Sequence, residues 1–97
     1  MNSYYVYIAT NIHHSVFYTG VTNNIERRMF EHKNKVYPNS FTARYNVNIL
    51  IYAEQFSYIN DAIFREKQIK DYSREKKLVL IKSTNPNFSN LLDEYYK

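Results

Sequence analysis

Residues 16–28 read VFYTGVTNNIERR, and this stretch is expected to join a strand to a helix. Val16 to Val21 is rich in β-branched and aromatic residues, which favours a strand. Residues 23–26 (NNIE) resemble a capping box with asparagine as the cap, so a helix is predicted from there to about Lys33. Gly20 is the only glycine among 97 residues. It permits a turn after the strand or the close approach of a backbone or a phosphate.

The segments on either side complete a small sheet. Tyr4 to Ala9 (YYVYIA) predicts a strand that pairs with residues 16–21 as an antiparallel hairpin. Residues 34–46 are polar and predict a loop. Residues 47–56 (VNILIYAEQF) predict a third, well-covered strand.

Two further helices are predicted, from Ile59 to Tyr72 and from a Ser73 cap to about Lys82. The order ββαβαα predicts a single α/β (α+β) domain, 1–97, with a three-stranded antiparallel sheet flanked by helices. The core is expected to span about residues 3–82. The remaining 83–97 would form a tail, irregular or with a short helix.

Composition limits the chemistry that the chain can perform. It has no cysteine, which excludes disulfides and thiolate metal sites. No apolar run approaches the ~20 residues of a membrane span, and the first ten residues lack a signal-peptide pattern. A cytoplasmic protein is therefore the expectation.

Positive charge is concentrated in one segment. The formal net charge is +4. Six basic and three acidic residues lie between Arg65 and Lys77, so this segment carries net +3 of that total. A basic stripe is typical of phosphate binding. A solvated helix face with i,i+4 ion pairs would show the same pattern.

The first helix carries polar residues on its inner side. At about 100° per residue, Ile25 and Met29 define its buried stripe, and Arg28 and His32 fall on the same side. Burying an arginine is costly unless it is paired. Either Arg28 lies at the margin and extends to water, or Arg28 and His32 meet a ligand in a cleft at the sheet edge.

A carboxylate interrupts the apolar face of the second helix. Glu66 lies in the middle of the stripe predicted to be buried, which is made by Ile59, Ala62, Ile63 and Ile69. One interpretation is an ion pair with Lys70 at i,i+4. The other is a metal ligand, because Mg²⁺ needs only one or two carboxylates when water and phosphate supply the rest.

Two phenols add to these groups. Tyr7 lies on the strand face opposite Val6 and Ile8, and Tyr18 on the face opposite Phe17. Two phenols, an arginine, a histidine and a glutamate suit phosphodiester hydrolysis better than acyl transfer. A phenol would need a neighbouring cation or metal to act as a base near pH 7.

These residues together resemble the GIY-YIG nuclease superfamily, and within it small stand-alone proteins related to the N-terminal nuclease domain of the bacterial excision-repair incision enzyme. Residues 5–7 (YVY) take the place of Gly-Ile-Tyr, and residues 18–20 (YTG) that of Tyr-Ile-Gly. Arg28 falls on the catalytic arginine and His32 on a histidine found in many members. Residues 64–70 (FREKQIK) resemble the subfamily's REKQIK stretch, with the metal-binding glutamate at Glu66.

The resemblance implies a single-metal DNA endonuclease or nickase in repair or recombination, acting on branched, nicked or single-stranded DNA. It implies that Glu66 holds one Mg²⁺ or Mn²⁺, that Tyr7 or Tyr18 positions or deprotonates the attacking water, that Arg28 stabilises phosphate charge, and that His32 assists proton transfer or orients a tyrosine. The expected DNA contacts are Arg44, Arg65, Lys67, Lys70, Arg74, Lys76 and Lys77.

Two positions depart from the family pattern. Tyr5 replaces the first glycine, and Leu78 stands where many members carry an asparagine, with Lys70 or Lys77 as candidates to replace it. Two alternatives therefore stay open: a DNA-binding module of the same fold that cuts weakly or not at all, and a protein-interaction domain.

Overall fold

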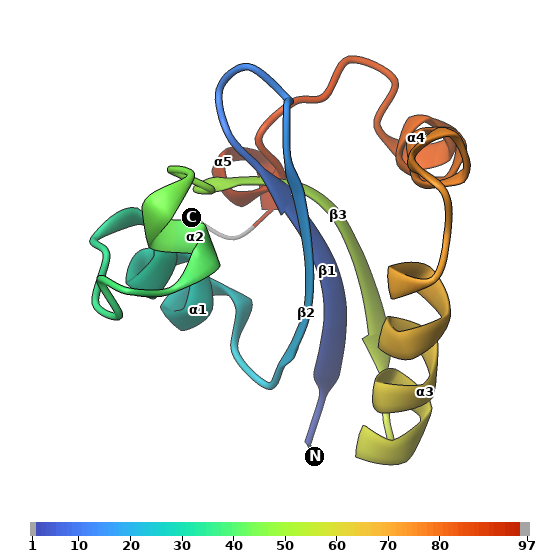
Figure 1. Ribbon diagram of the computed structural model, residues 1–97. Coiled ribbons are helices and arrows are strands. Elements are labelled where there is room, and N and C mark those ends of the chain that lie inside the picture. The colour runs from blue at the N-terminus through green and yellow to red at the C-terminus, as the bar shows by residue number, and fades with distance from the viewer. Residues whose placement is uncertain (1, 96–97) are drawn as a thin grey trace.

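Three antiparallel strands form the sheet in the computed structural model, which describes residues 2–95 (Figure 1). They are β1 (Tyr4–Thr10), β2 (Phe17–Thr22) and β3 (Ile49–Phe56). Their order is β2-β1-β3, so the hairpin strand β2 lies at one edge and β3 at the other. This confirms the predicted antiparallel sheet.

Helices surround the sheet in the predicted order. They are α1 (Ile25–Lys33), α2 (Phe41–Arg44), α3 (Ile59–Lys70), α4 (Arg74–Thr84) and α5 (Leu91–Tyr95). The prediction of a plain loop over 34–46 is wrong at α2. Ser40 caps this short helix by accepting a hydrogen bond from the backbone N–H of Ala43 at 3.2 Å.

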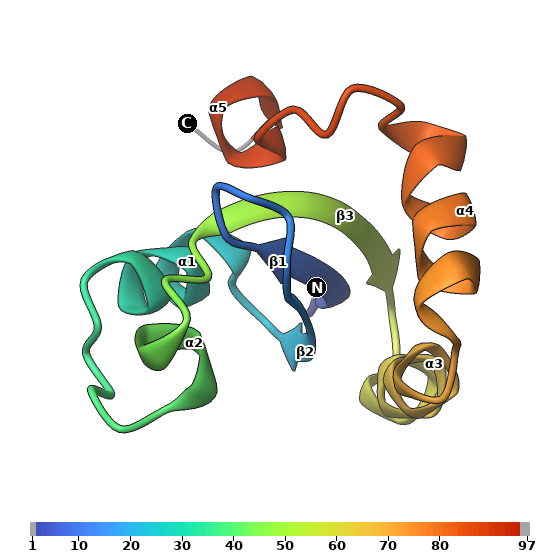
Figure 2. The same cartoon turned by 45° about the horizontal axis from the view of Figure 1, so that its top comes forward.

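The two faces of the sheet carry separate cores, as period-2 alternation predicts. Helices α1 and α2 lie on one side and α3 and α4 on the other (Figure 2). The core on the α3 side contains Val6, Ile8, Tyr52, Ile51, Ala62, Ile69 and Ile81. The core on the α1 side contains Tyr7, Ala9, Ile25, Met29, Val47 and Leu50. Tyr7 therefore faces α1, away from Val6 and Ile8.

Helix α3 packs on the sheet along a narrower stripe than its sequence predicts. Ala62 and Ile69 are fully buried, but Ile59 and Ile63 are 39% and 38% exposed. The prediction that both isoleucines are buried is wrong, because the strands cover only the line of residues closest to them.

The segment after residue 82, expected as a tail outside the core, packs on the sheet instead. The Asn85 side chain is buried, and it donates to the Ile51 carbonyl at 3.1 Å. Asn90 accepts from the Leu50 N–H at 3.3 Å, and the α5 residues Leu91 and Leu92 pack against the α1-side core. Because β3 is an edge strand, its backbone groups need such partners. The end of the predicted tail, 96–97, lies outside the described residues.

Within residues 2–95, none of the helices combines the length and the apolar character needed to cross a bilayer.

Candidate active site

The floor of the candidate site is the ring of Tyr7, which lies over Gly20. The two residues are paired in register across β1 and β2. A Cβ at position 20 would lie 2.6 Å from Tyr7 Oη and 2.7 Å from Cζ. Gly20 therefore lies within β2 and forms no turn, and the Tyr7 ring takes the space that a phosphate would need for a close approach. Position 20 requires a glycine because the phenol of Tyr7 occupies the space that any side chain there would need.

A buried chain of hydrogen bonds starts at Tyr7. Its hydroxyl lies 2.8 Å from His32 Nε2, and His32 Nδ1 lies 2.9 Å from Thr42 Oγ1. Thr42 Oγ1 in turn lies 3.1 Å from Ser40 Oγ. Strand β1, helix α1 and helix α2 are thus connected through polar side chains with little exposure to water. Thr42 was missed by sequence reasoning, because no periodicity links position 42 to position 32.

Burial sets the protonation of this chain. Burial first, and then the charge of Arg28, lowers the pKa of His32 to about 4, so the imidazole is neutral at pH 7. Burial, aided by Tyr18, raises the pKa of Tyr7 well above its usual value. A neutral imidazole carries one N–H, so one ring nitrogen of His32 donates and the other accepts along this chain of hydrogen bonds. Tyr7 and Thr42 together hold the His32 ring in place.

Tyr18 lies on the outer side of this chain, on the same sheet face as Tyr7. Its ring centroid is 6.1 Å from that of Tyr7 and 5.5 Å from that of His32. Tyr7 is fully buried, whereas Tyr18 is only partly buried. Of the two phenols, Tyr18 is the one that solvent or a ligand can reach.

Arg28 reaches the same place from α1. The helix begins where predicted, because Asn24 caps it by accepting from the Arg27 N–H at 2.9 Å. Arg28 pairs with Glu31 at 3.1 Å, and its side chain is 25% exposed. Burial alone would lower the pKa of Arg28, but Tyr7 and the hydrogen bond to Glu31 raise it overall. Arg28 thus stays charged at the margin of the core.

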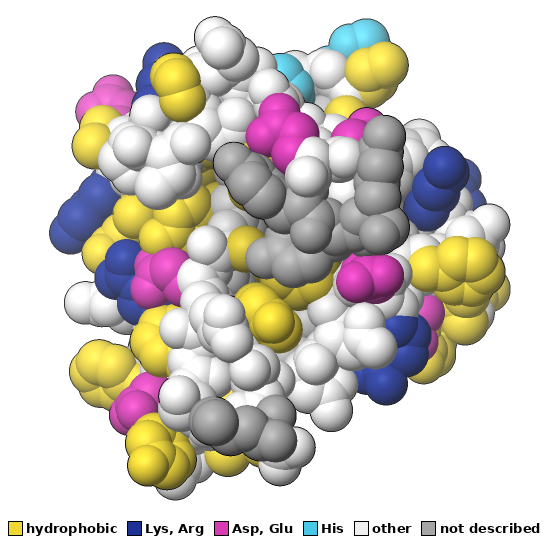
Figure 3. Space-filling view, turned by 180° about the vertical axis from the view of Figure 1, so that it is seen from behind, with side chains coloured by type: hydrophobic (Ala, Val, Ile, Leu, Met, Phe, Trp, Pro, Cys, Tyr) yellow, Lys and Arg dark blue, Asp and Glu magenta, His cyan; other side chains and the backbone are white. Residues whose placement is uncertain are grey.

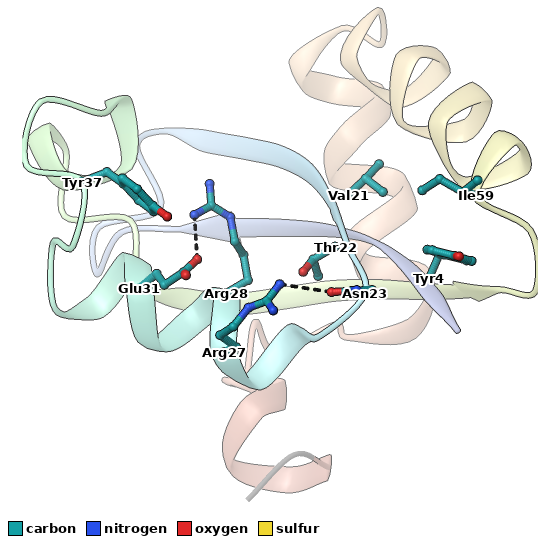
Figure 4. Close-up of a pocket in the computed structure, with 9 residues that line it drawn as sticks. All are labelled: Tyr4, Val21, Thr22, Asn23, Arg27, Arg28, Glu31, Tyr37 and Ile59. Carbon is teal, nitrogen blue, oxygen red and sulfur yellow. Dashed lines mark hydrogen bonds and ion pairs between the residues drawn. The ribbon is translucent and has the colours of Figure 1, made fainter. Parts of the chain in front are cut away.

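An open pocket of about 860 Å³ lies beside Arg28 (Figure 4). Arg28 and Glu31 form one wall, and Tyr37 lies over the arginine with its ring centre 5.8 Å from Cζ. Arg27 lines the same pocket but is bound to Asn23 at 3.0 Å. Near neutral pH this pocket offers two guanidinium groups, and that of Arg28 lies against the phenol cluster formed by Tyr7 and Tyr18.

Glu66 stands apart from these four residues. Helix α3 lies on the other face of the sheet (Figure 2). Glu66 lies on the stripe between the buried Ala62 and Ile69, is 19% exposed, and pairs with Lys70 at 3.3 Å. Within residues 2–95, no hydrogen bond, ion pair or ring contact connects Glu66 to Tyr7, Tyr18, Arg28 or His32. The structure therefore brings four of the five predicted residues together, and the predicted Glu66–Lys70 pair is present.

Two arginines predicted to contact DNA already have protein partners. Arg65 pairs with Glu54 at 3.0 Å, and this bond and those to Tyr72 and Tyr52 raise its pKa against the effect of burial. Arg74 donates to the carbonyls of His14 and Ser15 at 2.7 and 3.2 Å. Both guanidinium groups thus stabilise the fold.

The predicted lysines differ in their surroundings. Lys76 lies over the ring of Tyr72 at 4.2 Å, and Lys70 pairs with Glu66. Lys77 lines a small groove, while Lys67 and Arg44 are exposed. Arg44 lies on α2, close in sequence to the hydrogen-bonded Thr42.

Two phenols, an arginine and a neutral histidine thus meet on one face of a three-stranded sheet. Residues 3–78 match the family described as the GIY-YIG catalytic domain. The chain belongs to the GIY-YIG family.

Its relatives include small proteins of similar length. A UPF0213 protein of Staphylococcus haemolyticus is 38% identical over 81 residues, which is 84% of this chain and 96% of that one. One from Syntrophus aciditrophicus is 38% identical over 86 residues, covering 89% and 97%. The solution structure of a UPF0213 protein from Bacillus halodurans superposes with a TM-score of 0.58 at 25% identity, covering 98% of this chain and 99% of that chain.

Proposed function

We propose that this protein is a divalent-metal-dependent endonuclease that hydrolyses phosphodiester bonds of DNA, in repair or recombination. The observation that carries the proposal is the meeting of Arg28 with the two phenols beside an open pocket. A guanidinium binds a phosphate through two N–H groups at once, so Arg28 is suited to bind the scissile phosphate and to stabilise charge as it develops.

The two phenols have different roles in this proposal. Tyr7 is buried and hydrogen-bonded to His32, so it acts as a positioning residue that forms the floor beneath Tyr18. Tyr18 is the accessible phenol, and it orients or deprotonates the attacking water.

Glu66 is the carboxylate that would hold one hard cation in this proposal, and it lies apart from Arg28 and the two phenols. Glu66 supplies oxygen ligands, and Lys70, its exposed partner, can turn away into solvent. Glu31 and Glu54 are bound by arginines, and residues 2–95 contain no cluster of three or more possible metal ligands. Mg²⁺ or Mn²⁺ would then take its remaining ligands from water and the phosphate. When bound, the ion would supply positive charge to a phosphate oxygen that reaches Glu66.

The test is cleavage of branched, nicked and single-stranded DNA by neighbouring arginine variants. We expect Arg28→Ala to lower the cleavage rate by about 100-fold or more, as loss of a charged transition-state contact does. Arg27→Ala is the matched control, since it removes a guanidinium from the same pocket but not from the phenol cluster, and its rate should stay within about threefold. Equal loss in both variants, or no cleavage by the unmodified protein, would contradict the proposal.

The metal assignment has its own test. We expect EDTA to abolish cleavage and Mn²⁺ to restore it, and Glu66→Gln to weaken Mn²⁺ binding measured calorimetrically. Glu75→Gln, which removes an exposed carboxylate from α4, should bind Mn²⁺ normally. If Glu66→Gln binds Mn²⁺ as tightly as the unmodified protein, the ion is held elsewhere.

A second candidate is a DNA-binding module of the same fold. Two points favour it: Leu78 is apolar at the position where the family pattern leads us to expect asparagine, and Glu66 has Lys70 as its partner. Salt-dependent DNA binding without cleavage at any Mn²⁺ concentration would establish this candidate over the nuclease.

A further inference from the structure

A ladder of aromatic rings leads from the candidate site to the surface. Phe41 on α2 is stacked on Tyr18, with ring centroids 6.3 Å apart and planes 27° from parallel. Tyr45, the residue after α2, lies 4.7 Å from Phe41 by the same measure. Phe41 is 45% exposed and Tyr45 is 42% exposed. Water therefore reaches both rings, although they are held in place by their neighbours.

Basic residues lie near Phe41 in this ladder. Arg44 lies between Phe41 and Tyr45 in the sequence and is exposed. Phe41 also lines a groove of about 270 Å³, and Lys77 and Arg74 line the same groove. The charged residues that line this groove are both basic. Since Arg74 is bound to backbone carbonyls, Lys77 is the cation best able to meet a ligand there. A flat apolar surface beside positive charge suits a partner that combines flat rings with negatively charged phosphate groups.

We propose that Phe41 and Tyr45 form a stacking platform for unpaired bases of single-stranded nucleic acid, whose backbone passes between Lys77 and Arg28. This rests on the proposed function, and it names the form of the substrate. In a duplex each base face is covered by the next base pair, so a side chain on a rigid surface cannot stack on it. An unpaired base offers that face, and aromatic side chains bind it with little regard to sequence.

The position of the platform relative to Arg28 gives the proposal its geometry. Tyr18 touches the buried phenol cluster on one side and Phe41 on the other. A nucleotide stacked on Phe41 would therefore lie next to the phenol that faces the scissile phosphate. The substrate expected is a single strand, or a flap or gap in which a few nucleotides are unpaired.

The experiment measures binding of fluorescein-labelled oligonucleotides by anisotropy, with EDTA present so that cleavage does not interfere. The probes are a mixed-sequence single strand, the blunt duplex of the same sequence, and a single strand with three adjacent abasic sites. The variants are Phe41→Ala, Tyr45→Ala and Phe41→Leu, which keeps the apolar volume without the ring. Phe64→Ala is the control, because Phe64 is a highly exposed aromatic residue on α3, away from the ladder.

We expect the unmodified protein to bind the single strand more tightly than the duplex, and the abasic strand as weakly as the duplex. Phe41→Ala and Phe41→Leu should weaken single-strand binding by about 5- to 100-fold, the range for loss of one stacked base. Tyr45→Ala should act in the same direction, and duplex binding should change less than twofold in all variants. Phe64→Ala should match the unmodified protein, and circular dichroism melts check that each variant is folded.

The outcomes separate the two proposals. Nucleic-acid binding that Phe41→Leu leaves unchanged, or reduces equally for single strand and duplex, overturns the platform and leaves the nuclease proposal standing. Binding to none of the probes overturns both. If Phe41→Ala instead converts a dimer to a monomer in gel filtration without changing affinity, the ladder is a contact between protein copies and the platform is wrong.

Discussion

The imidazole of His32 is enclosed between a phenol and a threonine hydroxyl, and this makes it sensitive to acid. Burial, with Arg28, lowers the pKa of His32 from its ordinary 6.5 to about 4 in the folded protein. The unfolded chain therefore binds this proton more readily between these two values. The contribution of His32 to stability is complete above pH 6.5 and is lost as the pH falls through that interval toward 4.

We expect the free energy of unfolding to decrease by roughly 2–3 kcal/mol between pH 7 and pH 4 on account of His32 alone. Urea denaturation at several pH values measures this dependence. His32→Gln should flatten it, whereas His13→Gln, at an exposed position, should not. A pH dependence that is the same in His32→Gln and the unmodified protein would show that His32 is not the titrating group.

At the scale of single elements, the four residues of α2 serve two sides of the site. Thr42 points inward to His32, and Phe41, partly exposed, stacks on Tyr18. The helix is short, but Ser40 caps it and also contacts Thr42. Its position is therefore fixed by the same hydrogen-bond chain that orients Tyr7.

Thr42→Val tests whether that chain matters for catalysis. Valine keeps the shape but leaves His32 Nδ1 without a partner, so the imidazole loses the bond that selects its proton position. We expect kcat to fall about tenfold with KM nearly unchanged, and the ¹⁵N shifts of the His32 ring to move toward a mixture of tautomers. Thr42→Ser should restore both. Normal kcat together with altered shifts would restrict Thr42 to a structural role.

Much at this scale could be predicted from sequence. Periodicity predicted the strands and placed Arg28 and His32 on the inner side of α1. The asparagine cap predicted within residues 23–26 and the Ser73 cap gave the starts of α1 and α4. What escaped prediction depends on contacts between distant segments: Thr42 meeting His32, or the packing of residues 85–92 on β3. No local pattern encodes such contacts, and residue 41 differs from any exposed phenylalanine only through its tertiary neighbours.

At the scale of the whole molecule, the net charge overstates the surface available to a phosphate backbone. Figure 3 shows basic side chains at separate places on one face, often beside acidic ones. The segment from Arg65 to Lys77 carries most of the excess charge in sequence. In the fold, Arg65 and Arg74 bind protein groups and Lys70 pairs with Glu66.

Two variants separate structural from binding charges. Arg65→Gln should lower the free energy of unfolding by about 1 kcal/mol, since its ion pair with Glu54 is partly exposed, and should leave DNA affinity unchanged. Lys77→Gln should leave stability unchanged and reduce the slope of log affinity against log salt by about one. Urea melts and salt titrations of anisotropy measure these effects. If Arg65→Gln reduced the salt slope and Lys77→Gln did not, Arg65 would be the residue that faces the phosphates.

The contact between Gly20 and the ring of Tyr7 also limits how this chain can change by mutation. Any side chain at position 20 meets the phenol at 2.6–2.8 Å, so the strand pair must distort or the ring must leave. A substitution at position 20 could be accommodated by a smaller residue at position 7, but that residue would lack the hydroxyl that holds His32. Single mutational steps at position 20 therefore strain the fold, and the double change that relieves the strain dismantles the site. The two positions can vary only as a pair, and the sole glycine of the chain is tied to its chemistry through its neighbour.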